Sequence, residues 1–425
     1  MDDDAAGRID GIRIWDGRAE LGVGSLAWAA GRLTAVGPPA GPAAGDGAGS
    51  AGPAAGADEL CVLPGLVDTH VHLGGFAGRK GDPAGRDGYT WPLVTTVQEQ
   101  TLHVVANAQR AMRSGVTTLR DLAADEQQAA ARRVFEAEVL PGPRLQVSGP
   151  VGMTAGHLDL FTPPAVRDRP ATADGPDACR ALVRRWARAG MTGIKIFTSG
   201  GVLSIGDRVG WRNHTRAEIA ATIDEAHALG MLVACHTHTA EGIDLALEEG
   251  ADSIEHGSAM TAAQAEVLAE RRIPVGPTLL INEVIAERSA TGNAEARDAA
   301  VEVVAARDRV FPLAAAAGVR FVLGTDASGY FVEFGQQWDE LRRMTAVLGW
   351  DAERALQAGT SDAAASLGLG ELVGRLAPGM AADLVVLRGT PWRDPAHLAA
   401  DRVVAVVSRG RLVAGSLPAA PAGTR

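Results

Sequence analysis

The strongest constraint on the fold is a rhythm over residues 61–369, where short apolar stretches alternate with longer amphipathic ones, often ended by a glycine such as Gly115 or Gly190. Expected strands cover 61–67, 116–121, 144–149, 192–197, 231–236, 252–256, 273–276 and 319–325, and expected helices include 97–113, 176–189, 215–229, 261–271 and 296–316. Eight strand-then-helix periods predict a (β/α)8 TIM barrel over residues 61–370. An open doubly wound sheet is the alternative, but no G-x-G-x-x-G motif follows an early strand.

The two ends of the chain have a different pattern. Residues 1–60 and 371–425 contain short apolar strands separated by turns, for example at 12–15 and 403–407. These ends are expected to pair into one small β-sandwich domain beside the barrel. The Gly, Ala and Pro residues of 37–57 show no hydrophobic periodicity, so this segment is predicted to be a flexible loop.

Charge and composition exclude several classes of protein. The net charge is −11, from 40 basic and 51 acidic residues, which argues against nucleic acid as a partner, because phosphate contacts need a basic footprint. No apolar run approaches the ~18 residues that span a membrane. The acidic start, Met-Asp-Asp-Asp, lacks the features of a secretory signal, so a cytoplasmic protein with reduced cysteines is expected. The expected partner is a small-molecule substrate, and a homo-oligomer is left open.

Lysine is almost absent from the chain. Only Lys80 and Lys195 are lysine among the 40 basic residues, so a lysine that persists is a candidate for a role that arginine cannot take. Lys195 lies in the apolar strand Gly-Ile-Lys-Ile-Phe, where burial would lower its pKa and let the amine react with carbon dioxide or a carbonyl. A lysine paired with a barrel carboxylate is the alternative.

Metal-ligating side chains recur where the expected strands end, which is where barrel active sites lie. The first strand runs into Asp-Thr-His-Val-His (68–72), and alternation places His70 and His72 on one face. The strand expected over 231–236 ends in a second His-x-His motif, which places His236 and His238 on one face. The remaining strand-end candidates are His256, Asp326 and Lys195. Five strands that deliver such side chains to one rim predict a metal site.

These motifs carry a resemblance to a known family. The segments PGLVDTHVH (64–72), TSGGV (198–202), SIEHG (253–257) and GTD (324–326) resemble the amidohydrolase superfamily. Within it, the chain is most similar to the imidazolonepropionase-like group, which includes metal-dependent prolidases, Xaa-Arg carboxypeptidases and ochratoxin-type amidases. The segments GVTTLRD (115–121) and LAPGMAADLV (376–385) are also similar, so the resemblance covers nearly the whole chain.

The resemblance implies a role for each candidate. His70, His72 and Asp326 would hold one divalent ion, His236 and His256 a second, and carboxylated Lys195 would bridge the two, with zinc as the expected metal. A metal-bridging hydroxide would attack the scissile carbonyl, and Asp326 would carry its proton to the leaving amine. His238 is expected to face the substrate carbonyl, and His157, in a Gly-His loop, to lie in the substrate pocket. Asp68 is expected to support the ligands.

The sequence departs from the family over residues 74–92, whose role is not predicted. Arg79, Lys80 and Arg86 in this loop are candidates for holding a substrate carboxylate, although a solvated loop is the simpler interpretation. His103 lies within an expected helix, where a packing role is usual.

The sequence therefore predicts a binuclear metal hydrolase that cleaves an amide, of a dipeptide or an N-acyl amino acid. One alternative is a mononuclear deaminase or cyclic-amide hydrolase, which lacks the bridging lysine. Another is a non-catalytic, metal-free scaffold, against which the intact ligand set argues. Because fold does not fix substrate, lactones, carbamates and ureas also stay open.

Overall fold

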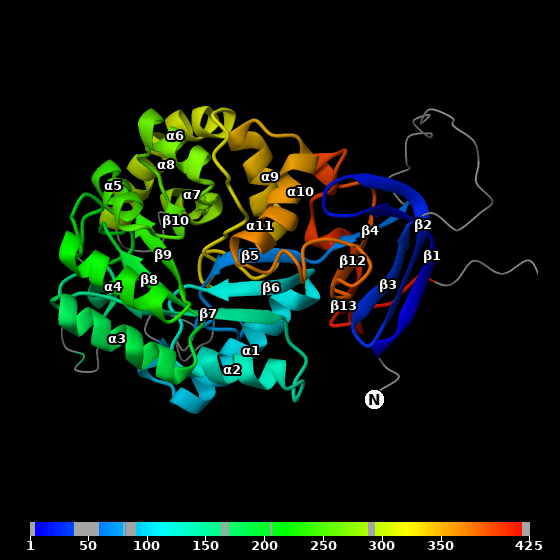
Figure 1. Ribbon diagram of the computed structural model, residues 1–425, viewed down its shortest axis with the longest axis horizontal. Helices are drawn as coiled ribbons and strands as arrows, with labels where there is room; N and C mark the ends of the chain where they lie inside the picture. The colour runs from blue at the N-terminus through cyan, green and yellow to red at the C-terminus, as the bar shows by residue number, and fades with distance from the viewer. Residues whose placement is uncertain are drawn as a thin grey trace, which may run out of the picture.

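The computed structural model describes residues 5–37, 59–79, 81, 91–162, 166, 170–204, 206–287 and 294–418. Figure 1 shows two units, a barrel of parallel strands surrounded by helices and a smaller sheet built by both ends of the chain. Apart from Gly37, the predicted flexible loop lies outside the described residues, as do Lys80 and Arg86. None of the described helices combines the length and the apolar character needed to cross a bilayer.

The barrel follows the predicted order of strands. The seven regular strands are β5 (Leu66–Val71), β6 (Val116–Asp121), β7 (Arg144–Val151), β8 (Gly193–Phe197), β9 (Leu232–Thr237), β10 (Ser253–His256) and β11 (Val275–Gly276). All neighbours pair in parallel, in the order of the chain. The TIM barrel is thus confirmed.

The eighth predicted strand, 319–325, is an extended segment and not a regular strand. Its backbone still hydrogen bonds on both sides: Val275 N donates to Arg320 O at 2.9 Å, and Thr69 N donates to Leu323 O at 2.9 Å. Isolated bridges pair Phe321 with β11 and Ala327 with Val71. The segment therefore closes the barrel between β11 and β5.

The helices lie around the barrel. They are α1 (Val97–Arg113), α2 (Glu126–Glu136), α3 (Pro176–Ala189), α4 (Arg216–Ala228), α5 (Ala240–Glu249), α6 (Ala262–Arg271), α7 (Leu279–Glu287), α8 (Ala294–Ala316), α9 (Gln337–Leu348), α10 (Ala352–Ala358) and α11 (Ser361–Ser366). The five predicted helices agree with α1, α3, α4, α6 and α8 to within two residues at each end. As the sequence indicates, Gly190 ends α3 in the left-handed conformation, with φ of 93°.

The strand predicted over 61–67 is wrong, because two strands of different sheets occupy this stretch. β4 (Leu60–Pro64) pairs with the terminal sheet, and the chain crosses at Gly65 into the barrel as β5. A Cβ at Gly65 would lie only 2.2 Å from Thr117 Oγ1, so the crossing needs a glycine. Hydrophobic pattern misses the change of sheet because both halves are apolar and buried.

The ends of the chain form one mixed sheet of seven strands. In spatial order they are β14 (Arg411–Gly415), β13 (Val403–Ser408), β12 (Leu384–Arg388), β4, β1 (Gly7–Trp15), β2 (Glu20–Ala29) and β3 (Arg32–Gly37). The indole N–H of Trp28 on β2 donates to Gly410 O, in the turn between β13 and β14, at 2.8 Å. These elements stand at opposite flanks of the strand order, so the sheet curls around a core that includes Ile9, Leu26 and Val386.

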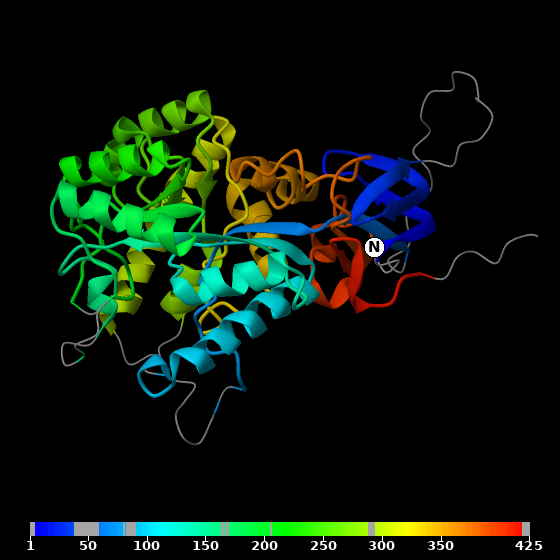
Figure 2. The same cartoon turned by 60° about the horizontal axis from the view of Figure 1, so that its bottom comes forward.

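The terminal sheet packs against the amino ends of the barrel strands. Arg144 at the start of β7 pairs with Asp383 at 2.8 Å, just before β12. In Figure 1 the arrowheads of β6 and β7 point away from this sheet, and the turned view of Figure 2 keeps it on the same side of the barrel. The carboxyl ends of the strands are therefore left free for a site.

The contact between Trp28 and Gly410 should stabilise the curled sheet. We expect Trp28→Phe to lower the free energy of unfolding by about 1 kcal/mol, because the ring stays and one buried hydrogen bond is lost. Trp28→Ala should cost about 3–5 kcal/mol, because it also leaves a cavity. Equilibrium denaturation measures both, with the exposed Trp211→Phe as a control that should stay within about 0.5 kcal/mol of the parent. Equal stability of the parent and Trp28→Phe would show that this hydrogen bond contributes nothing.

Candidate metal centre

A pocket of about 360 Å³ opens at the carboxyl ends of the barrel strands. The structure places the predicted metal ligands and the two predicted substrate-facing histidines around this one pocket, whereas Arg79 does not line it. Those that line it are His70, His72, His157, Lys195, His236, His238, His256 and Asp326. Strand geometry explains the convergence, because the carboxyl ends of parallel barrel strands meet at one rim.

The imidazole rings lie close enough to share metal ions. His256 is central, with its ring centroid 5.2 Å from that of His70 and 4.6 Å from those of both His236 and His238. Two sets of possible ligand atoms each lie within 4.8 Å of one another: His236, His238 and His256 form one set, and His70, His256 and Asp326 the other. His238, expected to face the substrate, thus also lies within reach of an ion.

The protein holds one nitrogen of each of these rings. His70 Nδ1 donates to Glu255 Oε2 at 2.9 Å, and His236 Nε2 donates to Gly200 O at 3.2 Å. Because a carboxylate and a carbonyl only accept, the other nitrogen of each ring keeps its lone pair. His256 Nδ1 contacts Thr278 Oγ1 at 2.7 Å, and His238 Nδ1 contacts Ser258 Oγ at 3.0 Å. Such partners are typical of metal-binding histidines, whose orientation they fix.

The electrostatics keep most of these rings neutral. Burial, aided by the Lys195 amine, lowers the pKa of His70 to about 4. Burial together with His157 lowers the pKa of His238 to about 3. The pKa values of His236 and His256 also fall well below their usual value, mainly through burial. A neutral imidazole offers the lone pair that a metal ion needs.

Lys195 lines the pocket with its side chain buried and its amine unpaired among the described residues. Its side chain is 2% exposed, and Nζ has no hydrogen-bond partner among the described residues. Burial lowers the pKa of Lys195 to about 8, although the negative charges of Glu255 and Asp326 act to raise it. A buried polar group without a partner is costly. The histidines and carboxylate suit a divalent metal, and the orphaned amine suits a carbamate that would give it two ligand oxygens, so the residues fit a metal centre.

Asp326 extends from the segment that closes the barrel. Its Oδ1 lies 2.9 Å from His72 Nε2 and 3.7 Å from His70 Nε2. Burial raises the pKa of Asp326, but the two histidines more than compensate and lower it to about 2, so the carboxylate is ionised at neutral pH. Its backbone has φ of 57°, and that of His256 has 70°. Left-handed backbone at two such side chains is strain of the kind found at functional sites.

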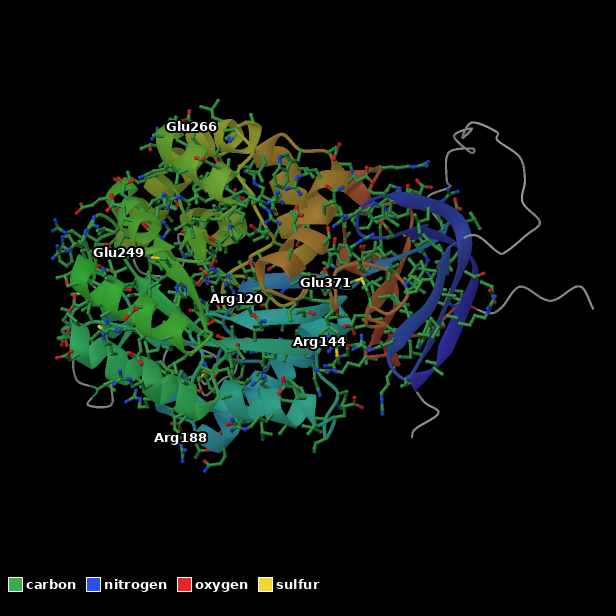
Figure 3. All side chains as sticks on the ribbon, in the orientation of Figure 1. Arg120, Arg144, Arg188, Glu249, Glu266 and Glu371 are labelled. Carbon is green, nitrogen blue, oxygen red and sulfur yellow. The ribbon has the colours of Figure 1, made fainter. Side chains whose placement is uncertain are left out.

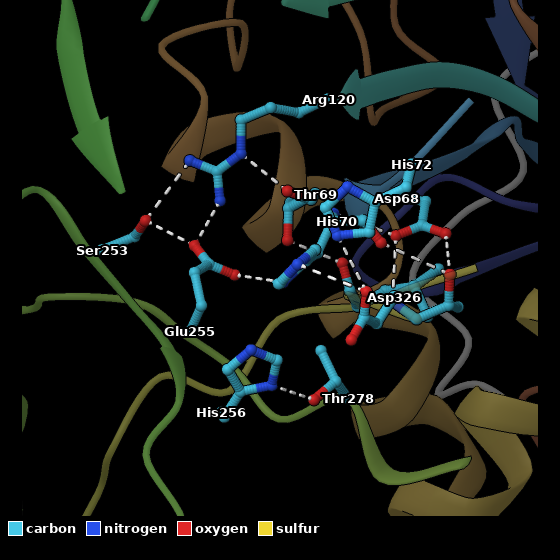
Figure 4. A network of polar contacts seen from close by, with 12 residues as sticks. Asp68, Thr69, His70, His72, Arg120, Ser253, Glu255, His256, Thr278 and Asp326 are labelled. Atoms are coloured by element: carbon cyan, nitrogen blue, oxygen red, sulfur yellow. Dashed lines mark hydrogen bonds and ion pairs between the residues drawn. The ribbon is translucent and has the colours of Figure 1, made fainter. Parts of the chain in front are cut away.

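A buried ion pair that the sequence analysis missed supports this centre. Arg120 on β6 donates from Nη2 to Glu255 Oε1 at 2.6 Å and from Nε to Thr69 O at 2.6 Å (Figure 4). Figure 3 shows Arg120 inside the barrel, whereas Arg188 and Glu266 lie on its outer helices. The sequence does contain a signal for this ion pair, because Arg120 and Glu255 are opposite charges on two predicted strands whose pattern indicates burial.

The other candidates occupy supporting or outer positions. Asp68 accepts from the backbone N–H groups of His70, at 3.1 Å, and Thr325, at 3.2 Å, which is the support predicted for it. The ring of His157 stacks on that of His236 at 4.5 Å. His103 accepts from Ala77 N at 2.9 Å and packs between two aromatic rings of the pocket wall.

A closed barrel with histidines, a lysine and an aspartate at its strand ends defines the class of metal-dependent barrel hydrolases. The Amidohydrolase family model matches residues 61–413, and the chain belongs to this family, which generally uses divalent metal ions. The chain is therefore a hydrolase, and its family membership supports metal-dependent hydrolysis of an amide.

Several proteins with a similar sequence or fold carry the names of hydrolases. An ochratoxinase of Aspergillus niger is 28% identical over 353 residues, which cover 78% of this chain and 71% of that protein. A solved Xaa-Pro dipeptidase with bound methionine is 28% identical, with a TM-score of 0.81 over 95% of this chain and 98% of the other. A solved putative prolidase from Bifidobacterium longum is 25% identical, with a TM-score of 0.77 over 96% and 94%.

Glu255 should control both the stability of the barrel and its affinity for metal. Glu255→Gln leaves the Arg120 guanidinium buried without an opposite charge, which typically costs about 3–5 kcal/mol of folding free energy. It also weakens the bond that orients His70, so metal affinity should fall about 10–100-fold. Thermal unfolding and metal titration measure the two effects, and the exposed Glu266→Gln serves as the control. A Glu255→Gln variant with the metal affinity of the parent would contradict the orienting role.

Proposed function

We propose that the protein is a binuclear metal-dependent amidohydrolase that cleaves the amide bond of a small-molecule dipeptide or N-acyl amino acid. The observation that carries the proposal is the unpaired Lys195 amine, buried within a cluster of neutral histidines and Asp326. The prolidase and ochratoxinase relatives support amide cleavage. We also propose the cytoplasm as its location, where the buried thiols of Cys61, Cys179 and Cys235 would stay reduced.

The proposed ligand sets follow the two faces of the cluster. His70, His72 and Asp326 would hold one ion, His236 and His256 the second, and Lys195, once carboxylated, would bridge them. Zinc suits this histidine-rich set. A single-ion hydrolase would give the buried Lys195 amine no partner, and a metal-free scaffold would have no use for four neutral imidazoles that face one another.

When bound, the ions would supply an activated water and a Lewis acid for the carbonyl oxygen. The chain's own residues would handle the proton and the substrate. Asp326 is ionised at neutral pH, so its carboxylate can accept a proton and pass it to the leaving amine. His238 has one nitrogen held by Ser258 and the other available to the substrate carbonyl. His157 would contact the substrate beside His236, on which its ring stacks.

Metal analysis of Lys195→Arg tests the binuclear arrangement. The parent should carry about two divalent ions per chain, lose activity to a chelator and regain it on adding zinc. Lys195→Arg should lose the second ion and most activity while remaining folded, because arginine stays protonated and cannot form a carbamate. Lys80→Arg, the same change at the other lysine, should keep both ions.

Two outcomes would overturn the binuclear assignment. One is a fully active Lys195→Arg variant, and the other is a parent enzyme that is fully active with one tightly held ion. A parent that binds no metal and gains no activity on adding it would favour the scaffold.

Asp326→Asn tests the proton transfer separately. Asparagine adopts the positive φ of this position readily and keeps one ligand oxygen, so the backbone and most of the metal content should survive. Turnover should fall by roughly 10²-fold or more, because the amide cannot accept the proton. Metal content and kcat on a verified amide substrate measure the effect, with the exposed Asp298→Asn as the control. Near-normal turnover would show that another group carries the proton.

A further inference from the structure

The pocket above the candidate ligands is mainly apolar. Its walls include Phe76, Trp91, Phe161, Ile281, Ile285 and Phe331, which come from loops or helices after four different strands or extended segments. Among the described residues, the lining contains no arginine, and its only lysine is Lys195, which the metal centre uses. A charged substrate side chain would therefore enter this pocket without a described partner of opposite charge on the walls, apart from the centre's own groups and the acidic Asp121.

One polar side chain interrupts the wall that α7 contributes. Asn282 lies between Ile281 and Ile285 on this helix and lines the pocket, with only 4% of its surface exposed. No hydrogen bond within the described part of the chain engages its side-chain amide. Pockets of this type use a few polar groups to orient a ligand that is otherwise held by apolar contact.

The amino end of α7 is not available to bind an anion. The two carboxylate oxygens of Glu340 accept from Leu279 N at 2.6 Å and from Leu280 N at 2.9 Å. A helix N-terminus normally attracts negative groups, but here the protein's own carboxylate occupies it. The Asn282 amide is therefore the group on α7 that is left to bind a substrate oxygen.

We propose that the enzyme takes amides with an uncharged apolar or aromatic side chain, and that Asn282 is a specificity residue that donates to a substrate oxygen acceptor. This proposal rests on the amidohydrolase function proposed above and deepens it. The acceptor is a carbonyl or a carboxylate oxygen, since an amide N–H binds both. The apolar walls hold the side chain while Asn282 fixes which end of the substrate faces the metal centre.

A substrate panel with metal-loaded enzyme tests the side-chain preference. N-acetyl-phenylalanine and N-acetyl-leucine should have a kcat/KM at least about 10²-fold above that of N-acetyl-arginine and N-acetyl-glutamate, because the charged side chains lose hydration without a partner. Equal or higher kcat/KM for the charged pair would overturn the proposal and leave the amidohydrolase function standing. No cleavage of any amide by enzyme with full metal content would overturn both.

Variants of Asn282 test the polar contact. Asn282→Leu should raise KM about tenfold or more on N-acetyl-phenylalanine with little change in kcat, because it removes a binding contact and no reacting group. The melting temperature and metal content should stay at the parent values. Glu287→Gln, on the exposed side of the same helix, should change none of these quantities. An unchanged KM for Asn282→Leu would overturn the assignment of Asn282.

Asn282→Asp distinguishes the two oxygen acceptors. If the acceptor is a carboxylate, the new negative charge should lower kcat/KM far more for the free acid N-acetyl-phenylalanine than for its uncharged C-terminal amide. If the acceptor is a carbonyl, both substrates should lose kcat/KM by a similar factor. Equal activity of Asn282→Asp and the parent on both substrates would again overturn the contact.

Discussion

The rest of the centre depends on the contacts that the buried carboxylate of Glu255 makes with Arg120 and His70. This carboxylate neutralises the buried guanidinium of Arg120, and it fixes the ring of His70 through Nδ1. Arg120 pulls the pKa of Glu255 below its usual range although burial opposes this, so the carboxylate stays charged. One negative charge thus joins β5, β6 and β10 and orients the first candidate ligand.

The irregular closure of the barrel follows from the same requirement for orientation. Asp326 N donates to His70 O at 2.8 Å, which brings the aspartate beside the histidines of the first strand. Asp326 then turns into the left-handed region, which a regular strand does not allow. The last barrel segment keeps enough backbone hydrogen bonds to close the sheet. Its regular pairing stops where the Asp326 carboxylate extends into the pocket.

The barrel separates stability from chemistry. At the amino ends of the strands, the curled terminal sheet contributes its own apolar core and is tied to the barrel by the pair between Arg144 and Asp383. At the carboxyl ends, burial keeps imidazoles neutral and leaves the Lys195 amine without a hydrogen-bond partner in the described part of the chain. The carboxyl ends of the strands therefore hold buried polar groups that destabilise the fold when they have no partner. Bound metal ions would give these groups partners.

The sequence by itself determined the elements and the side chains that meet at the rim. Period and length revealed the barrel, since each strand needs an apolar run and each covering helix an apolar face, and alternation placed His70 and His72 on one face. Only the tertiary structure decided what these local rules do not contain. Leu60–Pro64 and the first two residues of the next strand, Leu66 and Val67, are all apolar but belong to different sheets, because the crossing at Gly65 depends on how closely Thr117 packs. The pairing of Arg120 with Glu255 and the exposure of the Asn282 amide to the pocket were also hidden, because partners far apart in sequence are brought together only by closing the barrel.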